Sequence, residues 1–412
     1  MRICITFHEE AEKELTGDHK RVIGIARALK NLGHDVCLIE GASDNQSVRY
    51  KGIKIIHVKS LFARKQRMYA HKILSVIDRI LHIHGTISKL SYLLLDDPFI
   101  TIKATDVMAK SNIVIVMGDL TIAPLIGARI LNKKVMLDVI GFYLQSVYRM
   151  KQYIPFYSYY GRLVFLTLLG KLGYHLADKV IVPSYDDARN IIQILKLPEN
   201  RIDVIPNGID TSLFKPHLES RERVRKMLGL DASDTLVLFL GGDPGLGNTS
   251  AVKYITRILA PSIRAKYDNV FFAITGSWAS YGGDSGIIIT GYVDDVVGYI
   301  NAADLCIAPL TVGSGTKIKM LAYMACEKIT IATPVAAEGI NVSDGDQALI
   351  YDINTFTDGV LYAIENRAEL IDLAKNARTH IEKQFSWSRI ENDLNRLMLA
   401  LTKESESVNV SP

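Results

Sequence analysis

Short apolar stretches rich in β-branched residues alternate with helical stretches along this chain. Between the expected strands Arg2–Phe7 and Asp35–Glu40 lies the segment Asp18–Leu32, whose apolar residues fall on one face of a helix. A strand, a helix and a second strand in this order form a unit whose two strands run parallel, with a right-handed crossover. The alternation therefore predicts an α/β fold built on parallel sheets.

The same pattern continues through both halves of the chain. Further strands are expected at Ile53–Val58, Ile113–Met117, Lys134–Asp138 and Lys179–Val182, and then at Leu236–Leu240, Val270–Thr275, Ile287–Ile289, Leu305–Ala308, Ile329–Ala332 and Ala348–Tyr351. Residues 206–216 are rich in turn-forming residues and mark a linker. Because 412 residues exceed what one hydrophobic core usually serves, we expect two doubly wound domains.

Composition places the chain among globular proteins, with 48% hydrophobic and 22% charged residues. Its four cysteines are scattered, so we expect buried thiols in a reducing compartment. The apolar run Met1–Phe7 is too short for a secretory signal, and no run approaches the length of a membrane span. These features predict a cytoplasmic protein.

A glycine-containing turn in the second half is suited to bind phosphate. The strand-like stretch Leu305–Leu310 runs into the turn Gly313–Thr316, and a helix is expected to open near Thr316 with Lys317 and Lys319 in its first turn. Glycine lets backbone N–H groups approach a ligand, and the start of a helix adds unpaired donors and partial positive charge. With two lysines beside it, this turn predicts a phosphate-bearing ligand.

A second glycine-rich turn, Leu240–Asn248, also joins an expected strand to an expected helix. Turns of this kind lie at the carboxyl end of a strand, where α/β sheets bind ligands. The alternative interpretation is a tight connection without a ligand.

Several segments in a fixed order resemble the retaining, nucleotide-sugar-dependent glycosyltransferases of family 4, which have the GT-B fold. The segments are Val204–Asp210, Gly313–Lys317, Met324–Ala325, Thr330–Ile340 and Phe385–Trp387. The resemblance implies two Rossmann-like domains facing across a cleft, with residues 1–205 on the acceptor side and residues 206–384 binding the nucleotide sugar. It also implies that a helix at 385–404 packs back on the first domain. The polar tail at 405–412 is expected to be disordered.

The resemblance implies a donor site made from the two glycine-rich turns and the segment after the strand at 329–332. Its residues would be Gly241, Gly242, Asn248, Gly313, Ser314, Gly315, Thr316, Lys317, Lys319 and Glu338. Two features of the family are missing, namely an arginine and a lysine in the first turn and an acidic residue where this chain has Ala322. Because that acid would accept hydrogen bonds from ribose hydroxyls, we expect weaker donor binding, or a substitute carboxylate from Glu338 or Glu327.

The first half offers few candidates for catalysis. Relatives often have a histidine after the strand that here reads Lys134–Asp138, but this chain has none there. The candidates are Asp138, Asp119 and His19, each next to an expected strand end or helix start. The alternatives are a helix cap or turn former for either aspartate and a solvated surface position for the histidine.

The leading functional hypothesis is transfer of a sugar, with retention, from a nucleotide diphosphate to a glycan or lipid-linked acceptor in polysaccharide biosynthesis. The helix start at Gly313–Lys317 would stabilise the leaving group without a metal or other cofactor. The Asp344–Asp346 turn could bind a metal, but turn formation explains its residues. Two alternatives stay open: a catalytically silent GT-B scaffold, which the missing family residues favour, and a nucleotide-sugar epimerase.

Basic residues are concentrated between Lys59 and Lys89, where seven cations face one anion, a net charge of 7 − 1 = +6. Apolar residues at helical spacing make this segment a candidate basic amphipathic helix. A second segment, Tyr148–Tyr160, mixes basic and aromatic residues. Both are consistent with ordinary surface structure or with docking on anionic lipid at the inner face of the cell membrane. Without a recognition motif, no nucleic-acid partner is expected.

Overall fold

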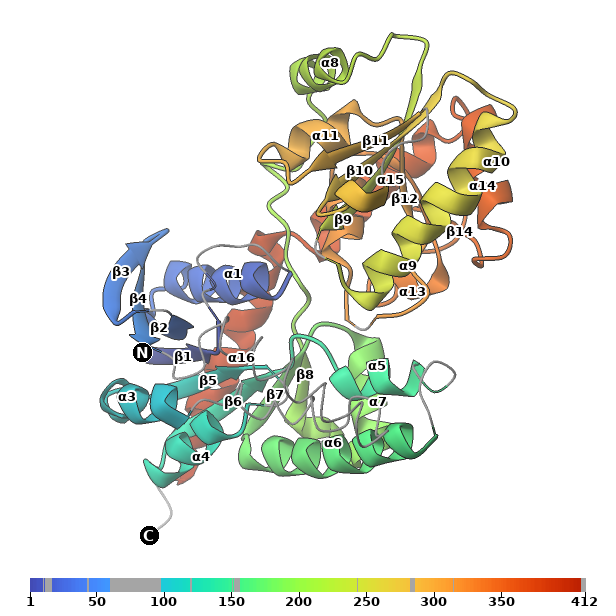
Figure 1. Ribbon diagram of the computed structural model, residues 1–412. Helices are drawn as coiled ribbons and strands as arrows, with labels where there is room; N and C mark the ends of the chain where they lie inside the picture. The colour runs from blue at the N-terminus through green and yellow to red at the C-terminus, as the bar shows by residue number, and fades with distance from the viewer. Residues whose placement is uncertain are drawn as a thin grey trace. The chain divides into compact units, whose positions relative to one another are not determined.

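The computed structural model describes residues 1–9, 11, 17–42, 44–59, 98–118, 121–149, 151, 156–242, 244–281, 286–313 and 315–408. The chain forms two compact units, and each has its own parallel sheet (Figure 1). Unit 1 comprises Met1–Pro206 and Ile390–Pro412, and unit 2 comprises Asn207–Arg389. The basic segment Lys59–Lys89 lies outside the described residues from residue 60 onward.

Unit 1 contains an eight-stranded sheet with the order β3-β4-β2-β1-β5-β6-β7-β8. Its strands are β1 (Arg2–Phe7), β2 (Asp35–Ala42), β3 (Gln46–Tyr50), β4 (Ile53–Lys59), β5 (Ile113–Met117), β6 (Lys134–Asp138), β7 (Lys179–Val182) and β8 (Ile202–Val204). All neighbours are parallel except β3 and β4. Every residue of β5 is buried, as expected for a strand covered on both faces, so its sequence is a continuous apolar run.

Two strands of this sheet differ from the sequence prediction. The antiparallel edge strand β3 was not expected, and neither was the three-residue β8. Lys51 and Gly52 join β3 to β4 with φ angles of 47° and 78°, which suit a two-residue hairpin turn. Because β3 is largely exposed, its residues do not form the apolar run that marks the buried strands.

Helices cover both sides of the unit 1 sheet (Figure 1). They are α1 (Gly17–Asn31), α3 (Pro98–Ala109), α4 (Ala123–Ile130), α5 (Tyr143–Arg149), α6 (Phe156–Leu176), α7 (Tyr185–Leu195), the single-turn helix η3 (Glu199–Arg201) and α16 (Trp387–Val408). Ser184 caps α7, because its side chain accepts a hydrogen bond from the amide of Asp187.

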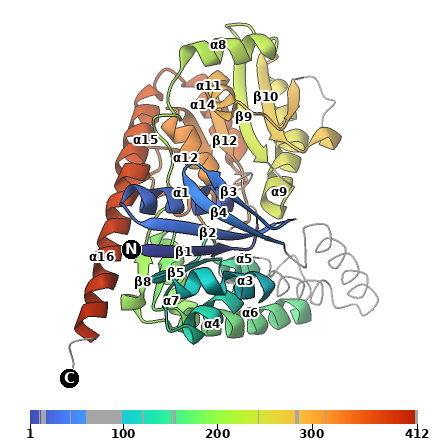
Figure 2. The same cartoon turned by 90° about the vertical axis from the view of Figure 1, so that its left-hand side faces the viewer.

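The last helix, α16, is the long red helix in Figure 2, and from Ile390 onward it belongs to unit 1. Its apolar residues Ile390, Leu394, Leu397, Met398 and Leu401 are buried. Near its start, Asn31 of α1 donates a hydrogen bond to Glu391 over 2.7 Å. The helix continues to Val408 and so extends into the tail that was expected to be disordered at 405–412.

Unit 2 contains a six-stranded, fully parallel sheet with the order β11-β10-β9-β12-β13-β14. Its strands are β9 (Thr235–Gly242), β10 (Val270–Gly276), β11 (Ile287–Gly291), β12 (Leu305–Ala308), β13 (Ile329–Ala332) and β14 (Leu349–Ile350). Its helical segments are α8 (Leu218–Met227), α9 (Leu246–Tyr254), η4 (Ile255–Leu259), α10 (Ala260–Arg264), η5 (Ala279–Tyr281), α11 (Val296–Ala302), α12 (Ile318–Ala325), α13 (Pro334–Ala337), α14 (Phe356–Glu365) and α15 (Ile371–Gln384). The strands expected from the sequence are all present.

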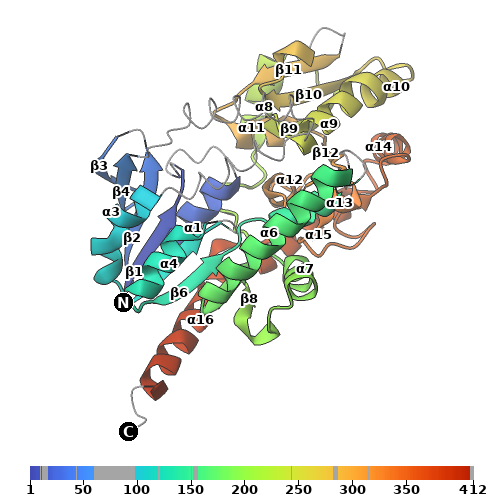
Figure 3. The same cartoon turned by 60° about the horizontal axis from the view of Figure 1, so that its bottom comes forward.

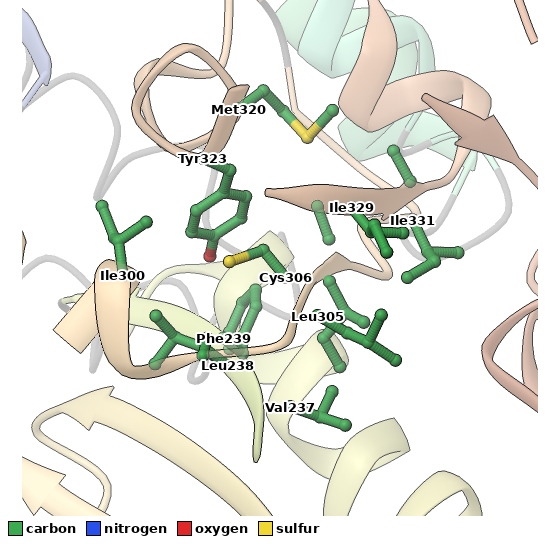
Figure 4. Close-up of a cluster of buried hydrophobic side chains, with 14 of the residues drawn as sticks. Val237, Leu238, Phe239, Ile300, Leu305, Cys306, Met320, Tyr323, Ile329 and Ile331 are labelled. Atoms are coloured by element: carbon green, nitrogen blue, oxygen red, sulfur yellow. The ribbon is translucent and has the colours of Figure 1, made fainter. Parts of the chain in front are cut away.

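The core of unit 2 fixes helix α12 against the sheet (Figure 4). Met320 and Tyr323 of α12 belong to the same buried cluster as Phe239 of β9 and Cys306 of β12. The Tyr323 hydroxyl accepts a hydrogen bond from the amide of Leu240 over 2.7 Å. This bond ties the helix to the last residues of β9, so the start of α12 has a defined place at the sheet's carboxyl edge.

Candidate functional site

The strand order of unit 2 identifies where a ligand can bind. From β9 the chain proceeds through β10 to β11 on one side and then returns to place β12 on the other side of β9. At such a reversal the crossovers on the two sides leave in opposite directions, and a crevice opens outside the carboxyl ends of the two strands. The two glycine-containing turns identified in the sequence, Leu240–Asn248 and Gly313–Thr316, lie at the carboxyl ends of β9 and β12 and therefore meet at this point.

Close packing below the first turn requires a glycine. A Cβ atom on Gly241 would lie 2.3 Å from Nε1 of Trp278 and 2.5 Å from the carbonyl oxygen of Thr275. Gly242 follows with a φ of 57°, a conformation that side chains disfavour. Close packing and backbone conformation explain both glycines without a ligand, in agreement with the alternative interpretation of a tight connection. The same two properties are also compatible with a role in ligand binding.

The two turns are in direct contact. A Cβ atom on Gly247, in the first turn of α9, would lie 2.7 Å from the carbonyl oxygen of Val312. The hydroxyls of Ser250 and Thr311 are 3.5 Å apart. Contact at two places means that the β9 and β12 turns form one continuous surface.

Lys317 is the N-cap residue of α12, which begins at Ile318 and not near Thr316 as expected. Its side chain folds back over the turn, and its Nζ donates a hydrogen bond of 2.5 Å to the carbonyl oxygen of Gly315. Gly313 has a φ of 141°, and its missing side chain leaves room for the Lys317 chain. The ammonium group is therefore held next to the amino end of α12, where positive charge is already concentrated.

Lys319 links the turn that follows β12 to the turn that follows β9. Its Nζ donates a 2.9 Å hydrogen bond to Oδ1 of Asn248 and lies 4.2 Å from the centre of the Phe239 ring. Burial and the nearby charge of Lys317 lower the pKa of Lys319 to about 7. A phosphate beside two lysines would favour their charged forms, so this pair is suited to bind an anion.

Glu327 and Glu338, the two acids that could replace the one missing at Ala322, lie in different places relative to helix α12. Ala322 is only 4% exposed and is part of the unit 2 core. Glu327 lies just past the far end of α12, so it cannot replace an acid near the helix start. Glu338 is closer, because the Thr316 hydroxyl donates a 3.4 Å hydrogen bond to the carbonyl of the adjacent Gly339. Of the two acids suggested by the sequence, the structure brings only Glu338 to the helix start.

Asp138 lies at the end of β6 and is completely buried. Nε of Arg21, which is also buried, donates a 2.9 Å hydrogen bond to its Oδ1. Burial raises the pKa of Asp138, and the guanidinium of Arg21 opposes that shift. The pair joins α1 to β6, and the catalytic role of Asp138 stays a prediction.

His19 is 5% exposed, so it does not occupy the solvated position considered as its alternative. Its Nε2 is 3.2 Å from Oε2 of Glu9, and its ring meets Phe7 edge-on. The third catalytic candidate, Asp119, and the donor-site residue Ser314 lie outside the described residues.

His8, which directly follows β1, was not among the candidates expected from the sequence. Unit 1 has its own strand-order reversal between β1 and β5, and His8 lies at that point. A Cβ atom on Gly118, just after β5, would lie 4.0 Å from Nδ1 of His8. The available signal was its position directly after the first strand of a strand–turn–helix unit.

Comparison with known families matches both parts of the chain. The "Glycosyltransferase Family 4" model matches residues 17–213, and the "Glycosyl transferases group 1" model matches residues 234–366.

Curated relatives include two bacterial D-inositol 3-phosphate glycosyltransferases. The protein of Acidothermus cellulolyticus is 25% identical over 198 residues, which cover 43% of this chain and 42% of the relative. The protein of Gordonia bronchialis is 26% identical over 234 residues, which cover 51% and 50%. The chain thus spans about half the length of the curated relatives it matches.

Solved structures match over nearly the whole chain. Sucrose-phosphate synthase of Thermosynechococcus elongatus superposes with a TM-score of 0.74 at 17% identity, covering 98% of this chain and 100% of the other. HepE of Anabaena, solved in complex with UDP, superposes with a TM-score of 0.68 at 12% identity, covering 97% and 100%. At these identities the match supports the shared GT-B fold. Together with the two family models, it shows that this chain belongs to the group 1 glycosyltransferases of family 4.

Proposed function

We propose that this protein transfers a sugar from a nucleotide-diphosphate donor to an acceptor, and that unit 2 binds the donor. The observation that carries the proposal is the pair Lys317 and Lys319 at the strand-order reversal, with Lys319 hydrogen-bonded to Asn248 of the other turn. The leaving group of this reaction is a nucleoside diphosphate. Two ammonium groups and a helix start can stabilise its charge as the sugar departs.

The donor would contact both turns and the segment after β13. We retain for this site Gly241, Gly242, Asn248, Gly313, Ser314, Gly315, Thr316, Lys317, Lys319 and Glu338. Glu338 is the candidate to accept hydrogen bonds from the donor's hydroxyls in place of the acid missing at Ala322. HepE of Anabaena has been solved with UDP and with UDP-glucose, which supports a uridine nucleotide as the first donor class to test.

Three finer features of the reaction belong to the proposal. Retention of configuration is proposed from the resemblance to retaining enzymes. Metal independence is proposed because lysines and backbone donors lie where the diphosphate charge would develop. A glycan or lipid-linked acceptor on the cytoplasmic side of a membrane, in polysaccharide biosynthesis, is the proposed partner.

Calorimetry with a panel of nucleotide sugars tests the donor site. Replacing Lys317 by alanine should weaken binding by about 1.5–3 kcal/mol, the usual worth of a hydrogen bond to a charged group. Lys253→Ala is the matched control, because Lys253 is an exposed lysine of α9 in the same unit. Unchanged affinity in the Lys317 variant, or an equal loss in both variants, would reject the assignment.

A catalytically silent scaffold is the second candidate. The observation in its favour is the buried methyl group of Ala322. The resemblance to family 4 implies an acid at this position. If none of the nucleotide sugars binds to the wild-type protein, the scaffold becomes the better explanation.

A further inference from the structure

Helix α6 has an exposed apolar face. Five large side chains on it recur at every fourth position: Phe156 is 74% exposed, Tyr160 39%, Val164 58%, Leu168 64% and Leu172 49%. Residues four apart on a helix lie one above the other, so these side chains form a continuous ridge. The helix is the long green one in Figure 3.

The opposite face of α6 is already packed in unit 1. A Cβ atom on Gly170 would lie 3.4 Å from Leu195 of α7. A Cβ atom on Gly173 would lie 3.6 Å from Leu125 of α4. Tyr174 and Leu166 on the same side are buried. The helix is therefore apolar on both its packed and its exposed face. An ordinary surface helix would be polar on the exposed one.

The neighbouring helices extend this apolar surface. Ile126 and Ile130 of α4 are 43% and 79% exposed, and α4 packs beside α6. Ile102 of α3, which packs on α4, is 62% exposed. The exposed apolar side chains thus continue from α6 onto two further helices of the same layer.

The stretch of sequence that contains α6 carries charge of one sign. From Val139 to Ala177 the sequence contains Arg149, Lys151, Arg162 and Lys171 and no aspartate or glutamate. Lys171 is exposed on α6 next to Leu172 of the ridge, and Lys151 is exposed shortly before the helix. Basic residues beside apolar and aromatic side chains match the chemistry of an anionic lipid surface, where the apolar groups enter the interface and the cations meet the headgroups.

We propose that the exposed face of α6 is a membrane-docking surface that lies in the plane of an anionic bilayer interface. No described helix, α6 included, is long and apolar enough to cross a membrane, so the helix would lie on the bilayer. Phe156 and Tyr160 would sit at the headgroup level. A second copy of the chain fits the face less well, because the basic residues of the two copies would oppose each other.

The inference extends the proposed function by naming the surface that would bring the enzyme to a lipid-linked acceptor. It does not depend on donor binding, because vesicle binding can be measured without any nucleotide. A protein that binds vesicles but no nucleotide sugar would leave the docking surface standing and reject the transferase proposal.

Flotation with vesicles tests the surface. The wild-type protein should float with vesicles of equal parts phosphatidylglycerol and phosphatidylcholine at low salt, and less with phosphatidylcholine alone or in about 0.5 M salt. The double variant Val164→Glu and Leu168→Glu should bind the anionic vesicles roughly tenfold more weakly or worse, because two carboxylates replace the inserted groups.

The matched control is Ile258→Glu with Ile371→Glu. These side chains of unit 2 are 52% and 51% exposed, so the control adds the same charge at similarly exposed apolar positions. It should bind within about twofold of the wild type. Equal losses in both double variants, or no preference of the wild type for anionic vesicles, would overturn the proposal.

The double glutamate change could disturb folding, so a second variant that keeps the surface apolar is also tested. With Leu168→Trp the tryptophan emission should shift to shorter wavelength when anionic vesicles are added, since the indole leaves water for the interface. No shift would contradict insertion of α6. Sedimentation that shows a dimer in the wild type and a monomer in the double variant would favour self-association over the membrane.

Discussion

In each unit the strand order reverses between two neighbours, β1 and β5 in unit 1 and β9 and β12 in unit 2. The same topology thus produces two equivalent positions for a ligand. In unit 2 this edge has glycine-rich turns and two lysines whose side chains are partly exposed. In unit 1 two pairs of ionisable groups near the strand ends are buried, namely Arg21 with Asp138 and His57 with Glu40.

The difference shows how one fold can serve two purposes. The Arg21–Asp138 pair inside unit 1 joins a helix to a strand, and its opposite charges largely cancel each other. In unit 2, Lys319 donates a hydrogen bond to the neutral amide oxygen of Asn248, and Lys317 donates one to the carbonyl oxygen of Gly315. An incoming phosphate would form stronger, charge-assisted hydrogen bonds with these ammonium groups.

The largest effect, on the free energy of unfolding, should come from breaking the buried Arg21–Asp138 pair of unit 1. Arg21→Met leaves Asp138 buried without its guanidinium, and removing one partner of such a pair costs roughly 3–5 kcal/mol. Urea denaturation should show this loss in the free energy of unfolding. Lys20→Met, an exposed neighbour on α1, should change it by less than about 0.5 kcal/mol. If Arg21→Met is as stable as this control, the pair does not hold the unit 1 edge together.

Most of the fold could be predicted from the sequence. The bounds of β1, β5, β6, β7, β12 and β13 are confirmed residue for residue, since strands buried on both faces are continuous apolar runs bounded by turns. The edge strand β3 was missed because its exposed residues alternate weakly. Helix starts were less well predicted, as α12 shows. Thr316 and Lys317 can each belong either to the cap or to the first turn of the helix, so the sequence alone does not fix the first residue.

The contacts of the candidate site could not be predicted in the same way. Lys319 and Asn248 are 71 positions apart, and Arg21 and Asp138 are 117 apart. Their contact depends on which strands are neighbours, and the local pattern of a strand does not encode its neighbours. Local chemistry could therefore identify Lys317 and Asp138 as candidates, but only the three-dimensional arrangement shows one beside an open turn and the other in a buried pair.

A smaller effect should follow from supplying the acid that unit 2 lacks. If the donor pocket is intact, Ala322→Glu should tighten nucleotide-sugar binding by about 1.5–3 kcal/mol through hydrogen bonds to ribose hydroxyls. Glutamate is a good helix former, so α12 itself should tolerate it. Calorimetry and the melting temperature are measured together. A lower melting temperature with no gain in affinity would mean that the buried carboxylate has no partner, which supports the silent scaffold.

The last effect, at most about 1.4 kcal/mol per pH unit, should be a pH dependence that has opposite signs for stability and for donor binding. The pKa of Lys319 is lowered to about 7 in the folded protein, whereas a lysine in the unfolded chain titrates near its usual value of about 10.4. Between these values the unfolded state binds more protons, so the contribution of Lys319 to stability rises with pH across this window. A phosphate prefers the charged amine, so donor affinity should fall over the same range, by at most about tenfold per pH unit.

Lys319→Met should flatten both dependences, because methionine keeps the apolar stem over Phe239 and removes the titrating group. Lys253→Met, at an exposed lysine of α9, should leave both unchanged. Calorimetry and urea denaturation between about pH 6 and pH 9 measure the two slopes on the same samples. Slopes of the same sign in the wild type would mean that Lys319 does not face the donor. In that case the charge of Lys319 would stabilise contacts within unit 2, as the Arg21–Asp138 pair does within unit 1, and would not bind a ligand.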